Sequence, residues 1–65
     1  MKTLLTKAEK PVLQLVAKGL TSKEIASQNH RSVRTIETHR LNIYRKLGVR
    51  NASEAVAKAK DDNLI

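Results

Sequence analysis

Residues 32–47 carry one continuous helical periodicity, and this stretch limits how the rest of the chain can fold. Ile36, Ile43 and Leu47 recur at a spacing that puts them on one side of an α-helix. At about 100° per residue, the opposite side carries a mixed set: Arg34, Glu37, Thr38, Leu41 and Arg45. A single α-helix of this width fits the DNA major groove. The stretch predicts a recognition helix or, as the alternative, an amphipathic surface helix with a solvated charged face.

Helix-start signals precede four segments of the chain. Their N-cap residues are Thr6, Thr21, Ser32 and Asn51, and all but Ser32 have a glutamate three positions later. Gly19 and Gly48 are the expected C-terminal stops. We therefore predict an all-α fold with helices over about 7–18, 22–28, 33–47 and 52–60.

Pro11 disturbs the first predicted helix. At its fifth position, proline cannot donate a hydrogen bond to the Lys7 carbonyl. We expect either a distorted first turn or regular helix that begins nearer Pro11.

The second and third predicted helices are separated by only a few residues, which is typical of a helix-turn-helix whose second member enters the groove. No alternating run of β-branched or aromatic residues predicts a strand. We expect residues 1–65 to form one four-helix domain of the helix-turn-helix type.

The charge balance favours a polyanionic partner. Thirteen Lys and Arg stand against six Asp and Glu, for a formal charge of +7. A single aromatic residue, a tyrosine, argues against the stacking platforms that bind single-stranded nucleic acid. Double-stranded DNA is therefore the partner that the composition fits best.

Length and composition exclude several other classes. A 65-residue chain leaves no room for a cleft enzyme, and without cysteine it has neither disulfides nor thiolate metal sites. We predict no cofactor and no metal. No apolar run approaches the roughly 20 residues that span a bilayer, so we expect a cytoplasmic protein, nucleoid-associated when bound to DNA.

A larger pattern of residues at fixed spacing runs through the chain. It comprises Leu5, Thr6, Glu9, Val12, Leu13, Gly19, Lys23, Glu24, Ile25, Ala26, Ser32, Thr35, Ile36, His39, Asn42, Ile43, Lys46, Leu47, Val49, Ala55 and Val56. This pattern resembles the C-terminal DNA-binding domain of LuxR/GerE-type bacterial transcription regulators. The resemblance implies that the third helix binds duplex DNA and that the fourth pairs two copies. It also implies a receiver or sensory domain outside this chain, as in a response regulator.

Three positions depart from that pattern. Asn29 and Arg31 stand where the family usually has apolar residues, which predicts a looser turn before the third helix. Pro11 stands where the family has a polar helix former.

Family position and helical angle together predict four contacts to base edges: Arg34, Glu37, Thr38 and Leu41. Arg34 bonds a guanine or holds a phosphate, and Leu41 lies against a thymine methyl. Glu37 accepts from cytosine N4 or, as the alternative, pairs within the helix with Arg40.

Five flanking residues are predicted to contact phosphates: Lys23, Thr35, Asn42, Arg45 and Lys46. For each lysine, plain solvation is the alternative. His39, beside the apolar stripe, is expected to be packed or bonded to the backbone rather than bound to metal. Arg40, at the core edge, is expected to bury its stem and extend its head to the surface.

The fourth predicted helix is rich in small residues. Its dimer candidates are Ala52, Ala55, Val56 and Ala59, which alternatively pack on the core. The family implies a two-fold homodimer here, and we expect it to be weak in so small a domain.

Two rival functions remain open from the sequence. One is a promoter reader like region 4 of a sigma factor, against which the pattern around His39 and Lys46 speaks. The other is an antiactivator, a protein-interaction module that pairs through the fourth helix with a full-length regulator.

Overall fold

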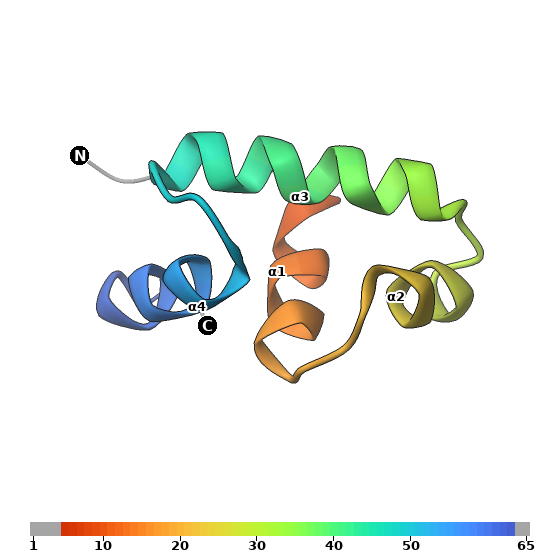
Figure 1. The fold of residues 1–65 in the computed structure, drawn as a ribbon, viewed down its shortest axis with the longest axis horizontal. Helices are drawn as coiled ribbons and strands as arrows, with labels where there is room; N and C mark the ends of the chain where they lie inside the picture. Colours follow the sequence, from red (N-terminus) through yellow and green to blue (C-terminus); the bar gives the residue numbers. More distant parts are fainter. Residues whose placement is uncertain (1–4, 64–65) are drawn as a thin grey trace.

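The computed structural model describes residues 5–63 as a bundle of four helices. They are α1 (Glu9–Ala17), α2 (Ser22–Gln28), α3 (Val33–Leu47) and α4 (Ala52–Asp61). Within this described part there is no strand, and the predicted all-α helix-turn-helix architecture is confirmed. In Figure 1, α3 lies across one side of the molecule, with α2 and α4 under its two ends and α1 running away from it between them.

The core lies where α3 meets the other three helices. Ile36 and Ile43 of α3 are fully buried together with Leu13 of α1 and Ile25 of α2. The rest of the core consists of Val12, Val16, Ala26, Leu47, Ala55 and Ala59. The predicted apolar stripe of the third helix is therefore its buried face, which turns the opposite face to solvent.

Side-chain caps begin α2, α3 and α4 where the sequence predicts them. The Thr21 hydroxyl accepts from the Glu24 N–H at 3.2 Å, and the Glu24 carboxylate accepts from the Thr21 N–H at 2.8 Å. These bonds lower the pKa of the Glu24 carboxyl. Ser32 and Asn51 cap α3 and α4 in the same manner, each accepting from the N–H three residues later. The starts of these three helices are thus determined locally.

The first helix is shorter than predicted. It covers Glu9–Ala17 rather than 7–18, although the bonds between Thr6 and Glu9 that the capping box requires are both formed, at 2.9 and 3.1 Å. Residues 7–8 form a turn instead, because Pro11 has no N–H for the Lys7 carbonyl. Both predicted effects of Pro11 are therefore seen: the first turn is irregular, and the regular helix begins nearer Pro11, at Glu9. The fourth helix runs one residue past its predicted end, to Asp61.

Three interhelical turns share one backbone geometry. Gly19 and Gly48 have φ of 92° and 70°, and His30, after α2, has φ of 54°. In each turn the next residue donates its N–H back to the last helical turn, as Arg31 does to the Ala26 carbonyl at 2.9 Å. Asn29 adds a side-chain bond to the Ile25 carbonyl at 3.0 Å. At the turn that the sequence predicts to be looser, these hydrogen bonds stand where the family usually has apolar packing.

Candidate nucleic-acid interface

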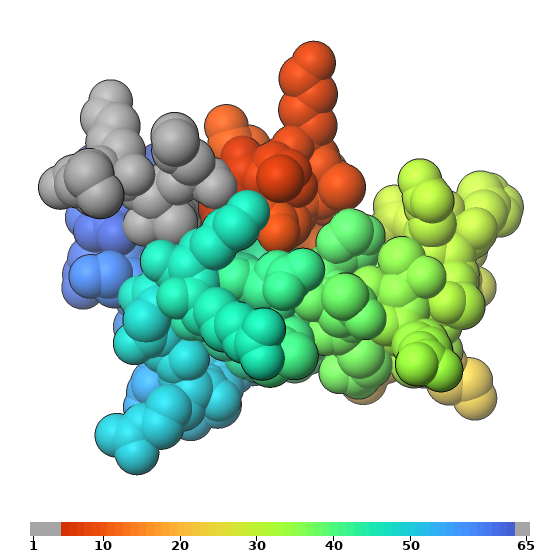
Figure 2. Space-filling view, turned by 90° about the horizontal axis from the view of Figure 1, so that it is seen from above, coloured from red at the N-terminus to blue at the C-terminus, as the bar shows by residue number. Residues whose placement is uncertain are grey.

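The solvent-facing side of α3 is the surface that the sequence predicts to contact DNA bases. All the side chains predicted on it are exposed: Arg34, Glu37, Thr38, Leu41 and Arg45. Leu41 is 49% exposed, so this face also offers an apolar side chain to a partner. Figure 2 looks onto this side, and α3, in green to cyan, runs across the view. The structure thus brings the four predicted base-contact residues together on one convex ridge.

Two threonines of α3 have their hydroxyls bonded within the helix. The Thr38 hydroxyl donates to the Arg34 carbonyl at 3.0 Å, and the Thr35 hydroxyl shares a bond with the Ser32 hydroxyl at 2.9 Å. A hydroxyl that donates within the helix still has lone pairs for an outside donor. Thr38 is therefore suited to accept a bond from a base amino group.

Glu37 stands in this ridge without a partner. In residues 5–63 its carboxylate makes no hydrogen bond or ion pair, so the alternative pairing with Arg40 is not formed. An unpaired carboxylate amid cations weakens nonspecific attraction to phosphates. Its position favours a role in choosing between bases.

The predicted phosphate residues lie along both flanks of the ridge. By helical angle, Thr35, Asn42 and Lys46 follow one edge of α3, while Lys23 lies in the first turn of α2 on the other side. Thr35 and Asn42 are half-buried, and Lys23, Arg45 and Lys46 are exposed. Cations on both edges match the two phosphate strands that border a groove.

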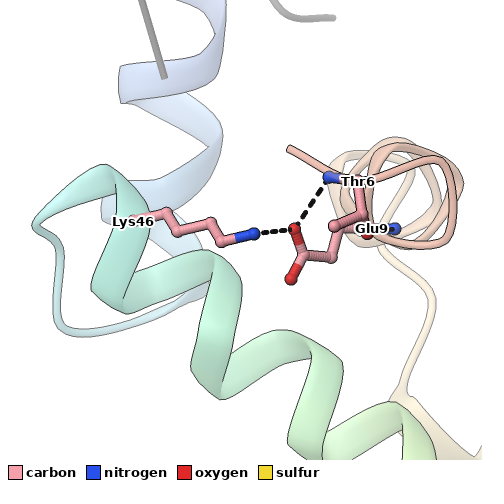
Figure 3. Close-up of polar contacts among 3 residues, drawn as sticks. All are labelled: Thr6, Glu9 and Lys46. Carbon is pink, nitrogen blue, oxygen red and sulfur yellow. Dashed lines mark hydrogen bonds and ion pairs between the residues drawn. The ribbon is translucent and has the colours of Figure 1, made fainter. Parts of the chain in front are cut away.

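Lys46 has a second partner that the sequence did not reveal. Its ammonium lies 2.6 Å from the Glu9 carboxylate, whose side chain is almost fully buried at the start of α1 (Figure 3). The same carboxylate oxygen accepts from the Thr6 N–H at 2.9 Å. Burial alone raises the pKa of the Glu9 carboxyl, but the bonds from Lys46 and Thr6 outweigh it and bring the pKa below its ordinary 4.5. Lys46 therefore links α3 to α1, with two ammonium hydrogens left for other acceptors.

Arg40 is also engaged differently from the expectation. Its guanidinium donates from Nε and Nη2 to the Tyr44 hydroxyl at 3.1 and 2.9 Å, and from Nη1 to the Ser22 hydroxyl at 3.0 Å. These bonds connect α3 to the first residue of α2. They border an open hollow of about 720 Å³ that Lys23 and Arg50 also line.

Sequence reasoning placed neither Tyr44 nor Arg50 in a site. For Tyr44, the available signal was its position four residues after Arg40 on the same helix. For Arg50, the signal was its position immediately before the N-cap of the fourth helix.

The dimer candidates on α4 divide into two pairs. Ala55 and Ala59 are fully buried against α1 and α3, so the structure corrects their assignment to a surface: they belong to the core. Ala52 and Val56 are half-buried and line a shallow hollow of about 460 Å³ together with Ser53, Ala57 and Lys60. Only this outer part of α4 is available to a second copy.

The remaining candidate is His39, beside the apolar stripe of α3. His39 is half-buried and borders a small hollow of about 180 Å³ with Pro11 and Asn29. Over residues 5–63, no three His, Cys, Asp or Glu side chains are grouped as a metal site would require. In the same part of the chain, every helix is too short or too polar to cross a membrane.

Known proteins resemble this chain over nearly its whole length. The model of the luxR family of bacterial regulatory proteins matches residues 3–59. Response regulator protein VraR of Staphylococcus aureus (strain Mu3 / ATCC 700698) is 44% identical over 62 residues, which are 95% of this chain and 30% of VraR. The VraR protein of Staphylococcus epidermidis matches to the same extent.

A solved structure is similar as well. The response regulator ChrA of a heme-sensing two component system superposes with a TM-score of 0.93 at 34% sequence identity. The match covers 100% of this chain and 32% of ChrA, so the chain spans less than a third of the length of these relatives.

Proposed function

The chain belongs to the luxR family of bacterial regulatory proteins, and from this premise we propose that it binds duplex DNA with α3 in the major groove. Family membership bears out the resemblance drawn from the sequence, and it assigns the chain to DNA-binding transcription regulation. Neither a sigma-factor-like promoter reader nor an antiactivator is better supported. The observation that carries the proposal is the ridge of α3, where Leu41 and an unpaired Glu37 face solvent between cations.

Four residues of the ridge are proposed to read base edges. Arg34 donates to guanine or to a phosphate, and Glu37 accepts from cytosine N4. Leu41 lies against a thymine methyl, and Thr38 offers its hydroxyl lone pairs to a base amino group. Acidic, basic and apolar groups on one face favour a readout of several neighbouring base pairs.

The phosphate contacts are proposed to lie on both sides of that ridge. Lys23 serves one strand, and Thr35, Asn42 and Lys46 serve the other, with Arg45 at the end of the exposed face. Lys46 contributes through the hydrogens that Glu9 does not occupy. These contacts set the register of α3 in the groove without reading sequence.

Two copies are proposed to pair through the outer part of α4. Ala52 and Val56, with Ser53 and Ala57 beside them, are small enough to let a second helix approach closely. Such a pair meets half-sites about one turn of DNA apart. We expect a weak dimer that DNA stabilises, because half of the predicted contact residues are buried inside the domain.

The rest of the regulator is proposed to lie outside this chain. The relatives are named response regulators, and the chain corresponds to about 30% of their length. A receiver domain that presents this domain to DNA in the bacterial cytoplasm fits that proportion. Such an arrangement makes the chain the output element of a signalling protein.

Binding to a mixed-sequence duplex tests the proposal. In an NMR titration at low salt, we expect backbone amides at Lys23 and along residues 33–46 to shift most. If about six phosphates are neutralised per domain, the slope of log affinity against log salt is near −5. A slope near zero, or shifts confined to residues 52–60, would contradict DNA binding through α3.

A further inference from the structure

The hydrogen-bond network around Arg40 contains donors without acceptors. Arginine only donates, so the Tyr44 hydroxyl oxygen uses its lone pairs on two guanidinium N–H groups and the Ser22 hydroxyl oxygen accepts a third. Across residues 5–63, neither hydroxyl hydrogen has an acceptor in the protein. Two of the five guanidinium hydrogens are also left over. The network therefore presents a surplus of donors.

These donors border a space that an anion can enter. The hollow of about 720 Å³ is lined by Arg40, Tyr44 and Ser22, and also by the cations Lys23 and Arg50. One carboxylate, that of Glu37, lies on its rim, so the lining carries three positive charges against one negative. Ser22 is only 8% exposed and Arg40 and Tyr44 are half-buried, which reduces the competition from water.

The hollow is placed beside the groove-facing ridge. Glu37, a residue of that ridge, is among its lining residues, and Asn51 and Ala52 line it at the start of α4. By helical angle, Arg40 and Tyr44 lie on the opposite flank of α3 from Thr35 and Asn42. An anion in the hollow is therefore next to a duplex whose major groove receives α3.

We propose that this hollow binds a phosphodiester group of duplex DNA, with Arg40 and Tyr44 as its donors and Lys23 and Arg50 as surrounding charges. The inference rests on the proposed function and adds to it a phosphate contact that lies in a hollow of the surface. Because Arg40 is already held by Tyr44 and Ser22, little side-chain freedom is lost on binding. A guanidinium fixed in this manner makes a charge-assisted bond to a phosphate oxygen.

Salt dependence of binding to a mixed-sequence duplex tests the site, because phosphate contacts do not require a known operator. Arg40→Met removes the charge, and Tyr44→Phe removes only the hydroxyl. We expect Arg40→Met to weaken binding roughly tenfold at low salt and to make the log–log slope shallower by about 0.9. Tyr44→Phe is expected to weaken binding about threefold with the slope unchanged.

Lys18→Met is the matched control, since Lys18 is an exposed cation that follows the end of α1 remote from α3 (Figure 1). Its slope and affinity should stay at the wild-type values. Thermal unfolding of each variant separates folding from binding. If Arg40→Met lowers affinity and thermal stability with an unchanged slope, Arg40 only holds α2 against α3 and the phosphate site is overturned.

Two further outcomes separate this site from the proposed function. If wild-type protein binds DNA through α3 but Arg40→Met changes neither slope nor affinity, the phosphate site is contradicted and the proposed function is not. If the wild-type protein shows no salt-dependent binding, the proposed function itself is contradicted, and with it the phosphate site that rests on it. Inorganic phosphate is the second probe: a shift of the Arg40 Nε–H signal by millimolar phosphate, combined with an unchanged DNA slope in Arg40→Met, would mark a free-anion site and overturn the assignment to DNA.

Discussion

Individual side chains on the exposed face of α3 differ in what they can still bond. Thr38 has its hydrogen bonded to the Arg34 carbonyl, whereas Glu37 is unpaired within the described chain. Leu41 has no polar group and is half exposed. In the proposed function, Glu37 and Thr38 accept from base amino groups and Leu41 contacts a methyl group, so specificity is expected to be distributed over single positions.

Replacement of Glu37 by glutamine tests this view. Loss of the negative charge should strengthen binding to mixed-sequence DNA, because repulsion from phosphates is removed. Discrimination at one C·G base pair should fall by about 1–3 kcal/mol. Selection of preferred sites from a random duplex library, followed by affinity measurements on single-base variants, checks both effects. Asp61→Asn, at the end of α4, is the control, and an unchanged site preference for Glu37→Gln would exclude base readout by this residue.

The buried carboxylate of Glu9 makes stability depend on pH. Its folded pKa lies below the unfolded value of 4.5, so at acidic pH the unfolded state binds more protons at this carboxylate than the folded state does. The stabilisation is present above pH 4.5 and is lost as the pH falls through the folded pKa. Glu9→Gln should therefore cost about 1–3 kcal/mol near pH 7 and much less at acidic pH. Urea unfolding from pH 7 to pH 3 measures this, and a constant difference would contradict the role of the ion pair.

Whole helices are delimited by signals that lie close together along the chain, and the turns repeat one backbone conformation. Gly19 and Gly48 adopt positive φ without a side-chain penalty, but His30 does so with a full side chain. The turn between α2 and α3, which sets the angle between these two helices, thus contains the most strained of these positions. Its hydrogen bonds to Ile25 and Ala26 compensate.

Glycine at position 30 should stabilise the domain. His30→Gly relieves the left-handed strain but adds freedom to the unfolded chain, so we expect a net gain of about 0.5–1 kcal/mol. Gly48→Ala is the converse control: nothing lies within 4 Å of the added Cβ, so its expected cost of about 1 kcal/mol arises from φ alone. Thermal unfolding of both variants measures the two effects. A destabilised His30→Gly would mean that the imidazole itself supports the turn.

Elements with short-range signals could be predicted from the sequence, and contacts between distant residues could not. Thr21 and Glu24 are three residues apart, so their capping box was visible. Glu9 and Lys46 are 37 positions apart, and Ser22 and Arg40 are 18 apart, and no local pattern connects them. Periodicity placed α4 correctly but did not distinguish buried Ala55 and Ala59 from exposed Ala57, since alanine suits both environments.

On the scale of the whole molecule, two surfaces are left for partners on different helices. The ridge of α3 faces DNA in the proposed function, and the outer part of α4 is free for a second copy. Because Ala55 and Ala59 belong to the core, the dimer surface is small. Pairing is therefore expected to require two half-sites that bring the copies together.

A charged residue on the outer part of α4 should separate pairing from DNA contact. Ala57 is exposed, so Ala57→Arg should leave the fold and the affinity for one half-site within about twofold. Cooperative binding to two half-sites about 10 base pairs apart should be lost. Gel-shift titrations on single and double half-sites measure this, with Ser27→Arg on α2 as the control for an added cation. Retained cooperativity in Ala57→Arg would place the dimer surface elsewhere.

The helices do not all contact one another. α3 packs against α1, α2 and α4, whereas α2 and α4 make no contact with each other in the described structure. Each of these two helices can therefore detach without exposing the other. In amide hydrogen exchange, we expect α2 and α4 to exchange through separate partial openings, while the amides of α1 and α3 exchange only when the whole domain unfolds.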